Sequence, residues 1–278
     1  MLNKKILTGC ACAALLGLST FGTAQAQVSS EPVAWNAQWQ YADSSAIHDG
    51  QAVLYHTDSA VKKNKTVCVN AGHGTSGGEE EQVLCHPDGT PKYVSGSTAA
   101  GSVYATAVAS GTTMADGTPE AEVNLAMARV VKELLLAEGY DVLMVRDGDD
   151  VQLDNIARTV LANQKADCHI AIHYDSTTSD KGAFCIVVPD IEAYKEMEPV
   201  KSYWQQHDRL AECLLDGLRA GGVELWGDGL LELDLTQTSY SLVPSVDMEV
   251  GDRASDYSEQ ELRRIARGIV AGVNRFFS

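Results

Sequence analysis

Apolar and polar positions switch between strand-like and helix-like spacing from residue 66 to the end of the chain. Short apolar runs, which predict strands, lie at 66–70, 140–146, 167–173, 183–189, 230–235 and 244–251. Apolar residues three and four positions apart, which predict helices, lie at 119–139, 153–166, 202–222 and 258–277. Strands that are apolar almost throughout and alternate with helices are typical of a sheet covered on both faces. We therefore predict a three-layer α/β fold with a mainly parallel, twisted sheet.

The first 26 residues do not belong to this alternation. A basic start, an apolar stretch and an Ala-x-Ala sequence ending at Ala26 predict a signal peptide that is removed on export. The apolar stretch is short and rich in small residues, which argues against a membrane-spanning helix. Cys10 precedes most of that stretch, so lipidation at this residue is disfavoured. We expect an exported protein, located in the periplasm or outside the cell.

Residues 27–64 are predicted to form an N-terminal arm packed on a domain that spans 65–278. The arm contains Trp35, Trp39 and Tyr41. Such aromatic side chains could stack on sugar rings, but burying them against the domain is the commoner use of their large apolar surface. We favour the second role.

One long segment, residues 75–117, separates the first strand of the domain from its helix. Loops of this length in compact domains are usually lids, binding loops or disordered segments. We predict an insertion that forms a partly mobile lid or groove wall, and our hypothesis is that it regulates access to the site.

The charge of the chain limits its partners. The formal net charge is −17, and the predicted signal peptide contains two lysines and no acidic residue, so the mature chain is more acidic still. Acidity of this size argues against binding to nucleic acids and to anionic membranes, and it is compatible with divalent cations.

Five cysteines follow the predicted signal peptide, and no two of them form a Cys-x-x-Cys pair. A thiolate zinc site is therefore disfavoured. We interpret Cys68, Cys168 and Cys185 as small apolar residues of core strands.

Two of the seven histidines follow predicted strands. His73 comes after the strand at 66–70, and His173 ends the strand at 167–173. Neighbouring parallel strands end at the same edge of a sheet, where ligands bind, so both imidazoles can meet there. His169 lies about 13 Å from His173 along the strand, too far to share one metal ion, and is interpreted as an ordinary strand residue or as a residue that supports a ligand. The remaining histidines are predicted to be surface residues: His48, His56, His86 and His207.

Two imidazoles and one carboxylate make a hydrolytic zinc site when the fourth position is left for water. Glu120 lies in the first turn of the helix after the insertion and is our candidate for the carboxylate. Glu122 is a close competitor, and the glutamates at 79–81 lie far into the insertion. Alternatively, Glu120 only complements the dipole of its helix.

The last predicted strand places Asp247 and Glu249 on one face and apolar residues on the other. Burying a charged carboxylate is costly, so each is either paired or faces the metal crevice. Glu249 lies nearer the end of the strand, where it could take a proton from water and pass it to a leaving amine. Asp247 is the alternative or a supporting residue.

These residues, in this order, resemble the zinc-dependent N-acetylmuramoyl-L-alanine amidases, also called type 3 cell-wall amidases. The resemblance covers about residues 66–277 and includes the strand, arginine and helix block at 142–167. The other matching motifs are Gly72-His73-Gly74, Glu120 with Asn124 and Leu125, Ala171-Ile172-His173, and Met248-Glu249. Asn70-Ala71 replaces the family's Asp-Pro, and Thr75 replaces a glycine.

The resemblance implies one zinc ion held by His73, Glu120 and His173, with Glu249 as the catalytic carboxylate. It implies cleavage of the peptidoglycan amide bond between N-acetylmuramic acid and L-alanine. We expect a monomer and identify no substrate-binding residues. The sequence does not indicate whether an activator protein is needed. Two alternatives are a zinc peptidase that acts on other amides and a cell-wall-binding homologue without catalysis.

Overall fold

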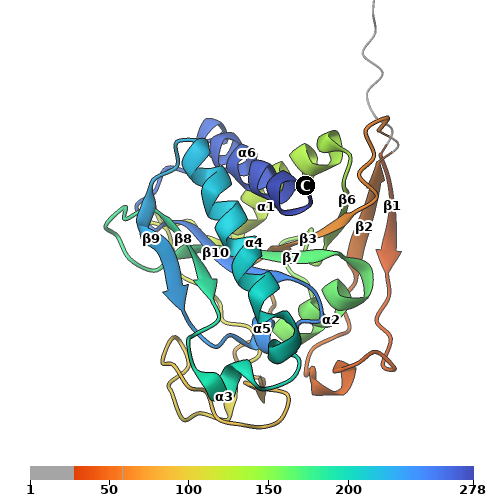
Figure 1. Cartoon of the computed structure of the whole chain (residues 1–278), viewed down its shortest axis with the longest axis vertical. Coiled ribbons are helices and arrows are strands. Elements are labelled where there is room, and N and C mark those ends of the chain that lie inside the picture. The colour runs from red at the N-terminus through yellow and green to blue at the C-terminus, as the bar shows by residue number, and fades with distance from the viewer. Residues whose placement is uncertain (1–27, 58) are drawn as a thin grey trace, which may run out of the picture.

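The computed structural model describes residues 28–57 and 59–278, so the predicted signal peptide lies outside the described residues. One eight-stranded sheet runs through the middle of the domain (Figure 1). In spatial order its strands are β1 (Val28–Val33), β2 (Ala52–Thr57), β6 (Asp141–Met144), β3 (Thr66–Ala71), β7 (Cys168–Asp175), β10 (Ser245–Asp252), β8 (Ala183–Val187) and β9 (Leu225–Glu232). The four central strands β6, β3, β7 and β10 are parallel to one another. The predicted three-layer α/β fold is confirmed.

Helices cover both faces of the sheet (Figure 1). Helices α1 (Glu120–Glu138), α4 (Val200–Ala220) and α6 (Glu259–Phe276) share the largest apolar core with one face. The other face carries α2 (Asn155–Lys165) and α5 (Thr236–Tyr240), and α3 (Glu192–Lys195) precedes α4. Helices α4 and α6 approach closely at Gly217 and Gly272, because a Cβ atom at either position would collide with the backbone of the other helix. Glycine at both positions therefore sets the spacing of this layer.

The N-terminal segment extends the sheet. Strand β1 pairs antiparallel with β2, and β2 pairs antiparallel with β6. Between the two strands, a 3-10 helix η1 (Ala42–Ser44) follows Trp35 and Trp39, which are half-buried and pack against two apolar clusters of the domain. These tryptophans therefore pack this segment against the rest of the described chain.

The insertion at 75–117 is folded. It contains β4 (Gln82–Leu84) and β5 (Tyr104–Thr106), which form a separate two-stranded sheet. The predicted strand at 230–235 ends earlier than expected: β9 ends at Glu232, and Asp234 turns inward to bind the insertion. Its buried carboxylate accepts hydrogen bonds from the backbone of Tyr93 (2.6 Å) and Val94 (3.0 Å).

Two further side chains of the insertion reach the same carboxylate. Lys92 Nζ lies 3.2 Å and His86 Nε2 lies 3.1 Å from an oxygen of Asp234. Burial alone would raise the pKa of Asp234, but the contact with His86, the backbone amides and Lys92 lower it to about 2. Asp234 is therefore an ionised anchor that joins the insertion to the chain after β9.

The prediction that His86 and His207 lie at the surface is wrong. His86 is fully buried because it packs against Asp234, and His207 is buried on α4, where its Nδ1 accepts a hydrogen bond from Ser245 N (2.9 Å). His169 is also fully buried, and neither of its ring nitrogens has a hydrogen-bond partner among the described residues. Burial lowers the pKa of His169 and of His207 to about 3, so both are neutral.

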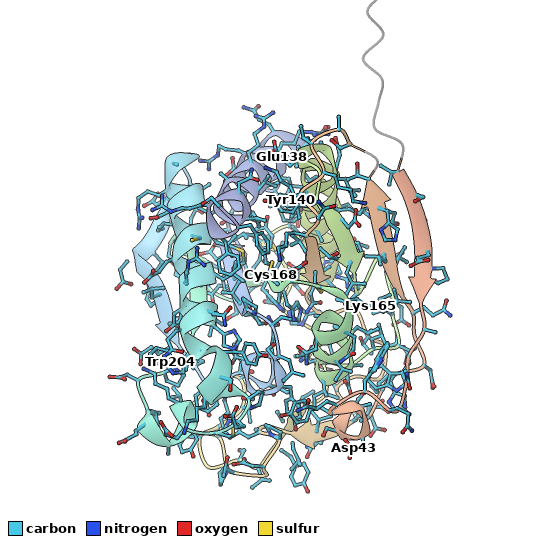
Figure 2. The ribbon with its side chains drawn as sticks, turned by 45° about the vertical axis from the view of Figure 1, so that its right-hand side comes forward. Asp43, Glu138, Tyr140, Lys165, Cys168 and Trp204 are labelled. Carbon is cyan, nitrogen blue, oxygen red and sulfur yellow. The ribbon has the colours of Figure 1, made fainter. Side chains whose placement is uncertain are left out.

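All five cysteines of the described chain are free and buried, as the core interpretation of Cys68, Cys168 and Cys185 requires. Cys168 lies in the middle of the domain, between the helical layers (Figure 2). Burial raises the pKa of the Cys68 thiol well above its usual range. In the part of the chain that the structure describes, no helix is both long and apolar enough to cross a membrane.

Candidate metal centre and active site

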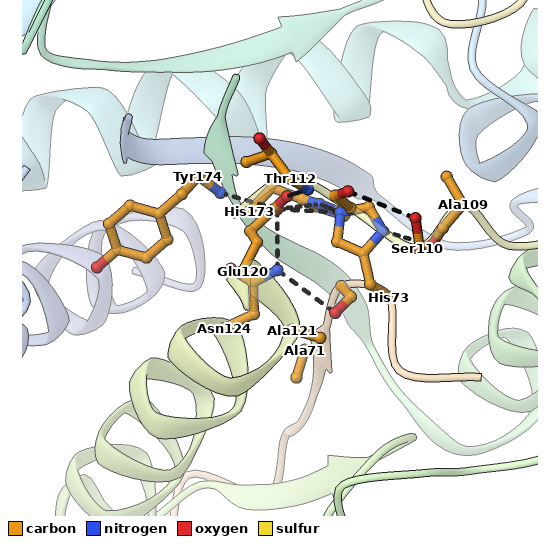
Figure 3. A network of polar contacts seen from close by, with 12 residues as sticks. Ala71, His73, Ala109, Ser110, Thr112, Glu120, Ala121, Asn124, His173 and Tyr174 are labelled. Carbon is orange, nitrogen blue, oxygen red and sulfur yellow. Dashed lines mark hydrogen bonds and ion pairs between the residues drawn. The ribbon is translucent and has the colours of Figure 1, made fainter. Parts of the chain in front are cut away.

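Three side chains from distant parts of the chain meet at the carboxyl end of the central strands (Figure 3). His73 follows β3, His173 lies in the parallel neighbour β7, and Glu120 is the first residue of α1. His73 Nε2 lies 3.0 Å from His173 Nδ1 and 3.0 Å from Glu120 Oε1, and His173 Nδ1 lies 3.2 Å from the same Glu120 oxygen. The structure therefore brings the three predicted residues together.

The hydrogen bonds of the two imidazoles determine which nitrogens face the centre. His73 Nδ1 donates to the carbonyl oxygen of Ala109 (2.7 Å), which leaves the lone pair on Nε2 directed at the other two residues. His173 presents Nδ1 to the centre, while its Nε2 lies 3.7 Å from Asp247 Oδ2. A ligating histidine commonly has its second nitrogen directed at a carbonyl or a carboxylate in this way.

Glu120 is buried and ionised. Its Oε2 accepts a hydrogen bond from Thr112 N (2.8 Å), and its Oε1 accepts from Asn124 Nδ2 (3.1 Å) and Tyr174 N (3.2 Å). Burial alone would raise the pKa of Glu120, but the hydrogen bonds and charges of His173 and His73 hold it well below its usual range. A carboxylate that stays charged at 3 % exposure is suited to bind a cation.

Two buried arginines support the turn that carries His73. Arg146 donates to the carbonyl oxygens of Ala71 (3.0 Å) and Gly72 (3.0 Å). Arg158 donates to those of Ala71 (3.1 Å) and His73 (2.7 Å). His73 itself has the left-handed backbone conformation, with φ of 63°. The guanidinium groups therefore hold an uncommon turn, a role that sequence reasoning missed although both arginines lie in the block at 142–167.

Glu249 and Asp247 lie on β10 beside β7, on the sheet face that carries His173. In the parallel register Glu249 is opposite His173, and Asp247 is opposite Ala171. Glu249 Oε2 and Asp247 Oδ1 are buried atoms without a hydrogen-bond partner among the described residues. Burial raises the pKa of Glu249 well above its usual range, and the negative charge of Asp247 raises it further. The Glu249 carboxylate is thus a stronger base than usual, and its Oε2 has no hydrogen-bond partner among the described residues.

A cavity of about 900 Å³ connects these groups. The insertion, β7, β8 and the chain after β9 form its walls. Glu79 lines the cavity, but it accepts a hydrogen bond from Ser110 N (3.0 Å) instead of joining the three central residues, and Glu122 is exposed. The described residues contain one group of at least three possible metal ligands whose donor atoms all lie within 4.8 Å of one another. This group consists of His73, Glu120 and His173.

The spacing of these donor atoms fits zinc. Two nitrogen or oxygen ligands at about 2.0–2.1 Å from a tetrahedral zinc ion lie roughly 3.3 Å apart. The distances of 3.0–3.2 Å between His73 Nε2, His173 Nδ1 and Glu120 Oε1 are close to that value. Two imidazole nitrogens with one carboxylate also form a donor set that leaves one coordination position open for water.

The chain is similar to known proteins of one family. Residues 67–275 match the family model described as N-acetylmuramoyl-L-alanine amidase. No curated protein matches the chain. Among solved structures, the amidase Ami1 from Mycobacterium smegmatis is similar at 22% identity and a TM-score of 0.62, over 79% of this chain and 99% of that one.

Two other solved structures share the same fold. The apo form of Ami1 from Mycobacterium abscessus has 21% identity and a TM-score of 0.60, over 77% of this chain and 99% of its own. An N-acetylmuramoyl-L-alanine amidase from Clostridium difficile 630 has 18% identity and a TM-score of 0.54, over 76% and 96%. At these identities the likeness concerns the fold.

Proposed function

Because the chain belongs to the N-acetylmuramoyl-L-alanine amidase family, we propose that it hydrolyses the peptidoglycan amide bond between N-acetylmuramic acid and L-alanine with the help of one zinc ion. The observation that carries this proposal is the meeting of His73 Nε2, Glu120 Oε1 and His173 Nδ1 at one point of the cavity. In our proposal these three atoms hold the metal.

Zinc in this place would polarise the scissile carbonyl group and make water a stronger nucleophile at neutral pH. The chain supplies the proton transfer. Glu249 Oε2 has no other hydrogen-bond partner among the described residues, so it is free to accept the proton of the attacking water. The same oxygen then delivers that proton to the leaving amine of L-alanine. Burial raises the pKa of Glu249, which makes its ionised form a stronger base for the first of these steps.

We further propose that residues 1–26 act as an export signal and that residues 65–278 form the catalytic domain. Peptidoglycan lies outside the cytoplasm, so an enzyme that cleaves it has to be exported, which agrees with the sequence of the N-terminus. We propose that the enzyme acts as a monomer. We make no proposal about an activator protein.

Digestion of purified sacculi tests the function. We expect the protein to release peptides with a new amino-terminal L-alanine, a chelator to abolish the release, and added zinc to restore it. Hydrolysis of free peptides without release from sacculi would instead support the zinc peptidase. Binding to sacculi without release of peptides would support the non-catalytic homologue.

A further inference from the structure

The end of the insertion passes directly beside two of the three proposed zinc ligands. We infer that residues 109–112 are a fixed part of the metal centre, which hold His73 and Glu120 in position, and that Gly111 is the positioning residue that makes this contact possible. This inference rests on the proposed function, because it concerns the affinity of the same site for its metal.

Both ligands are hydrogen-bonded to the backbone of this segment. The carbonyl oxygen of Ala109 accepts the proton of His73 Nδ1 (2.7 Å), and the amide of Thr112 donates to Glu120 Oε2 (2.8 Å). The first bond fixes the tautomer and the ring plane of His73, and the second fixes the rotation of the Glu120 carboxylate. Partners of this kind make a ligand more basic and orient its lone pair.

Gly111 lies between these two hydrogen bonds. A Cβ atom at this position would lie 2.6 Å from His73 Cδ2 and 2.9 Å from Glu120 Oε2, and the residue has φ of 86°. The backbone therefore contacts both ligand side chains directly, and only a residue without a side chain fits. A methyl group here would collide with both the imidazole and the carboxylate, so at least one of them would have to move.

The segment is itself held on both sides. Before it, Val108 N donates to Gly78 O (3.1 Å), and Ala107 N donates to Glu81 O (2.9 Å). At its end, Glu120 N donates to Thr112 O (3.0 Å), and beyond it Ala115 N donates to Arg253 O (2.8 Å). Opening the insertion as a lid would therefore break the support of the ligands, so a fixed wall explains the contacts better than a gate.

A pair of glycine variants separates this role from ordinary backbone strain. Gly111 and Gly101 both have φ of 86° and both belong to the insertion, but a Cβ atom at Gly101 would have no atom within 4 Å. Gly111→Ala and Gly101→Ala therefore share the strain of the left-handed conformation, while only the first collides with the ligands. Zinc affinity is measured for both by competition with a chromophoric chelator.

We expect Gly111→Ala to weaken zinc binding by about 10- to 100-fold, as the loss of groups that orient a ligand does elsewhere, and Gly101→Ala to leave it as in the wild type. Equal affinities of the two variants would overturn the inference. A wild-type protein that binds no zinc would instead refute the proposed function.

A second measurement does not depend on metal or on the folding of a glycine variant. Hydrogen exchange of the metal-free wild-type protein should show slow exchange at the Thr112 amide, because this group is bonded to a buried carboxylate. The exchange should become faster in Glu120→Ala. Fast exchange in the wild type, or no change in the variant, would overturn the inference.

Discussion

Gly72 forms the surface against which the imidazole ring of His173 rests. A Cβ atom at Gly72 would lie 2.1 Å from Cε1 and 2.4 Å from Nε2 of that ring. Gly72 directly follows β3, and His173 lies in the neighbouring strand β7, so the pairing of two strands brings the glycine under the ring. The position of a proposed ligand thus depends on the absence of a side chain on the next strand.

We predict that Gly72→Ala displaces His173 and weakens zinc binding about tenfold or more, since the ring has to leave its place. Amidase activity on sacculi should fall with it. Zinc content after dialysis against a weak chelator measures the effect. Gly148→Ala is the matched control, because the nearest atom to a Cβ there is 3.6 Å away, and it should keep wild-type zinc content. Retained zinc in Gly72→Ala would contradict this relationship.

Glu249→Gln should lower the turnover number by about 10²- to 10⁴-fold, the range for loss of a general acid–base group, and should leave the zinc content unchanged. The amide keeps the size of the side chain but cannot accept the proton. Single-turnover digestion of sacculi and metal analysis of the same samples check both parts.

Asp247→Asn is the companion variant, because Asp247 lies on the same face of β10 and also has a buried oxygen without a partner among the described residues. We expect a smaller loss of turnover than in Glu249→Gln. The opposite order of the two losses would assign the proton transfer to Asp247.

Asp234→Ala should destabilise the protein by about 3–5 kcal/mol, because it leaves the buried Lys92 without the negative charge that it pairs with, and the amides of Tyr93 and Val94 without their acceptor. Urea unfolding measures the loss, and limited proteolysis should then cut the insertion. In the control Asp190→Ala, which breaks an ion pair between Lys195 and an exposed aspartate, we expect a loss of only about 0–1 kcal/mol. Equal losses of unfolding free energy in the two variants would show that Asp234 does not anchor the insertion.

The stability of the fold should decrease in mild acid because of its buried neutral histidines. The pKa of His169 falls from an ordinary value of 6.5 to about 3 on folding, so between these values the unfolded chain binds a proton that the folded chain does not. The contribution of His169 to the free energy of unfolding is therefore fully present above pH 6.5 and is lost as the pH falls towards 3. Each such histidine contributes a slope of about 1.4 kcal/mol per pH unit.

His169→Leu removes one of these groups, and its side chain has no hydrogen bond to lose among the described residues. Urea unfolding between pH 4 and 6.5 should therefore show a flatter dependence of the unfolding free energy than in the wild type. Parallel curves for the two proteins would mean that His169 does not titrate between the two states.

The central sheet and the meeting of His73 with His173 could be predicted from the sequence because both follow from one rule. Apolar strands that alternate with helices form a parallel sheet, and residues at the ends of neighbouring parallel strands are close together. Glu120 followed from the same rule, since its helix begins near that edge. The identity of the metal rests on the donor set and on the resemblance, the role of Glu249 rests on its place in the last strand and on the resemblance, and both stay proposals.

The environment of His86 could not be predicted, because its partner Asp234 lies 148 residues further along the chain and no local pattern links them. The same holds for the departures from the family pattern. Asn70 and Thr75 both accept hydrogen bonds from Arg158 (3.1 and 2.9 Å), so the unusual residues share one buried guanidinium. Contacts of this kind depend on packing across elements, which spacing along the chain does not reveal.

The buried free cysteines have a consequence for how the protein is made. The described fold contains five unpaired thiols and closes its core without a covalent cross-link among them. The described chain should therefore reach its native state equally well with or without an oxidant, and it does not need a thiol oxidase or a disulfide isomerase. Because these thiols lie away from solvent and burial disfavours their ionised form, the finished molecule should also resist alkylating agents until it unfolds.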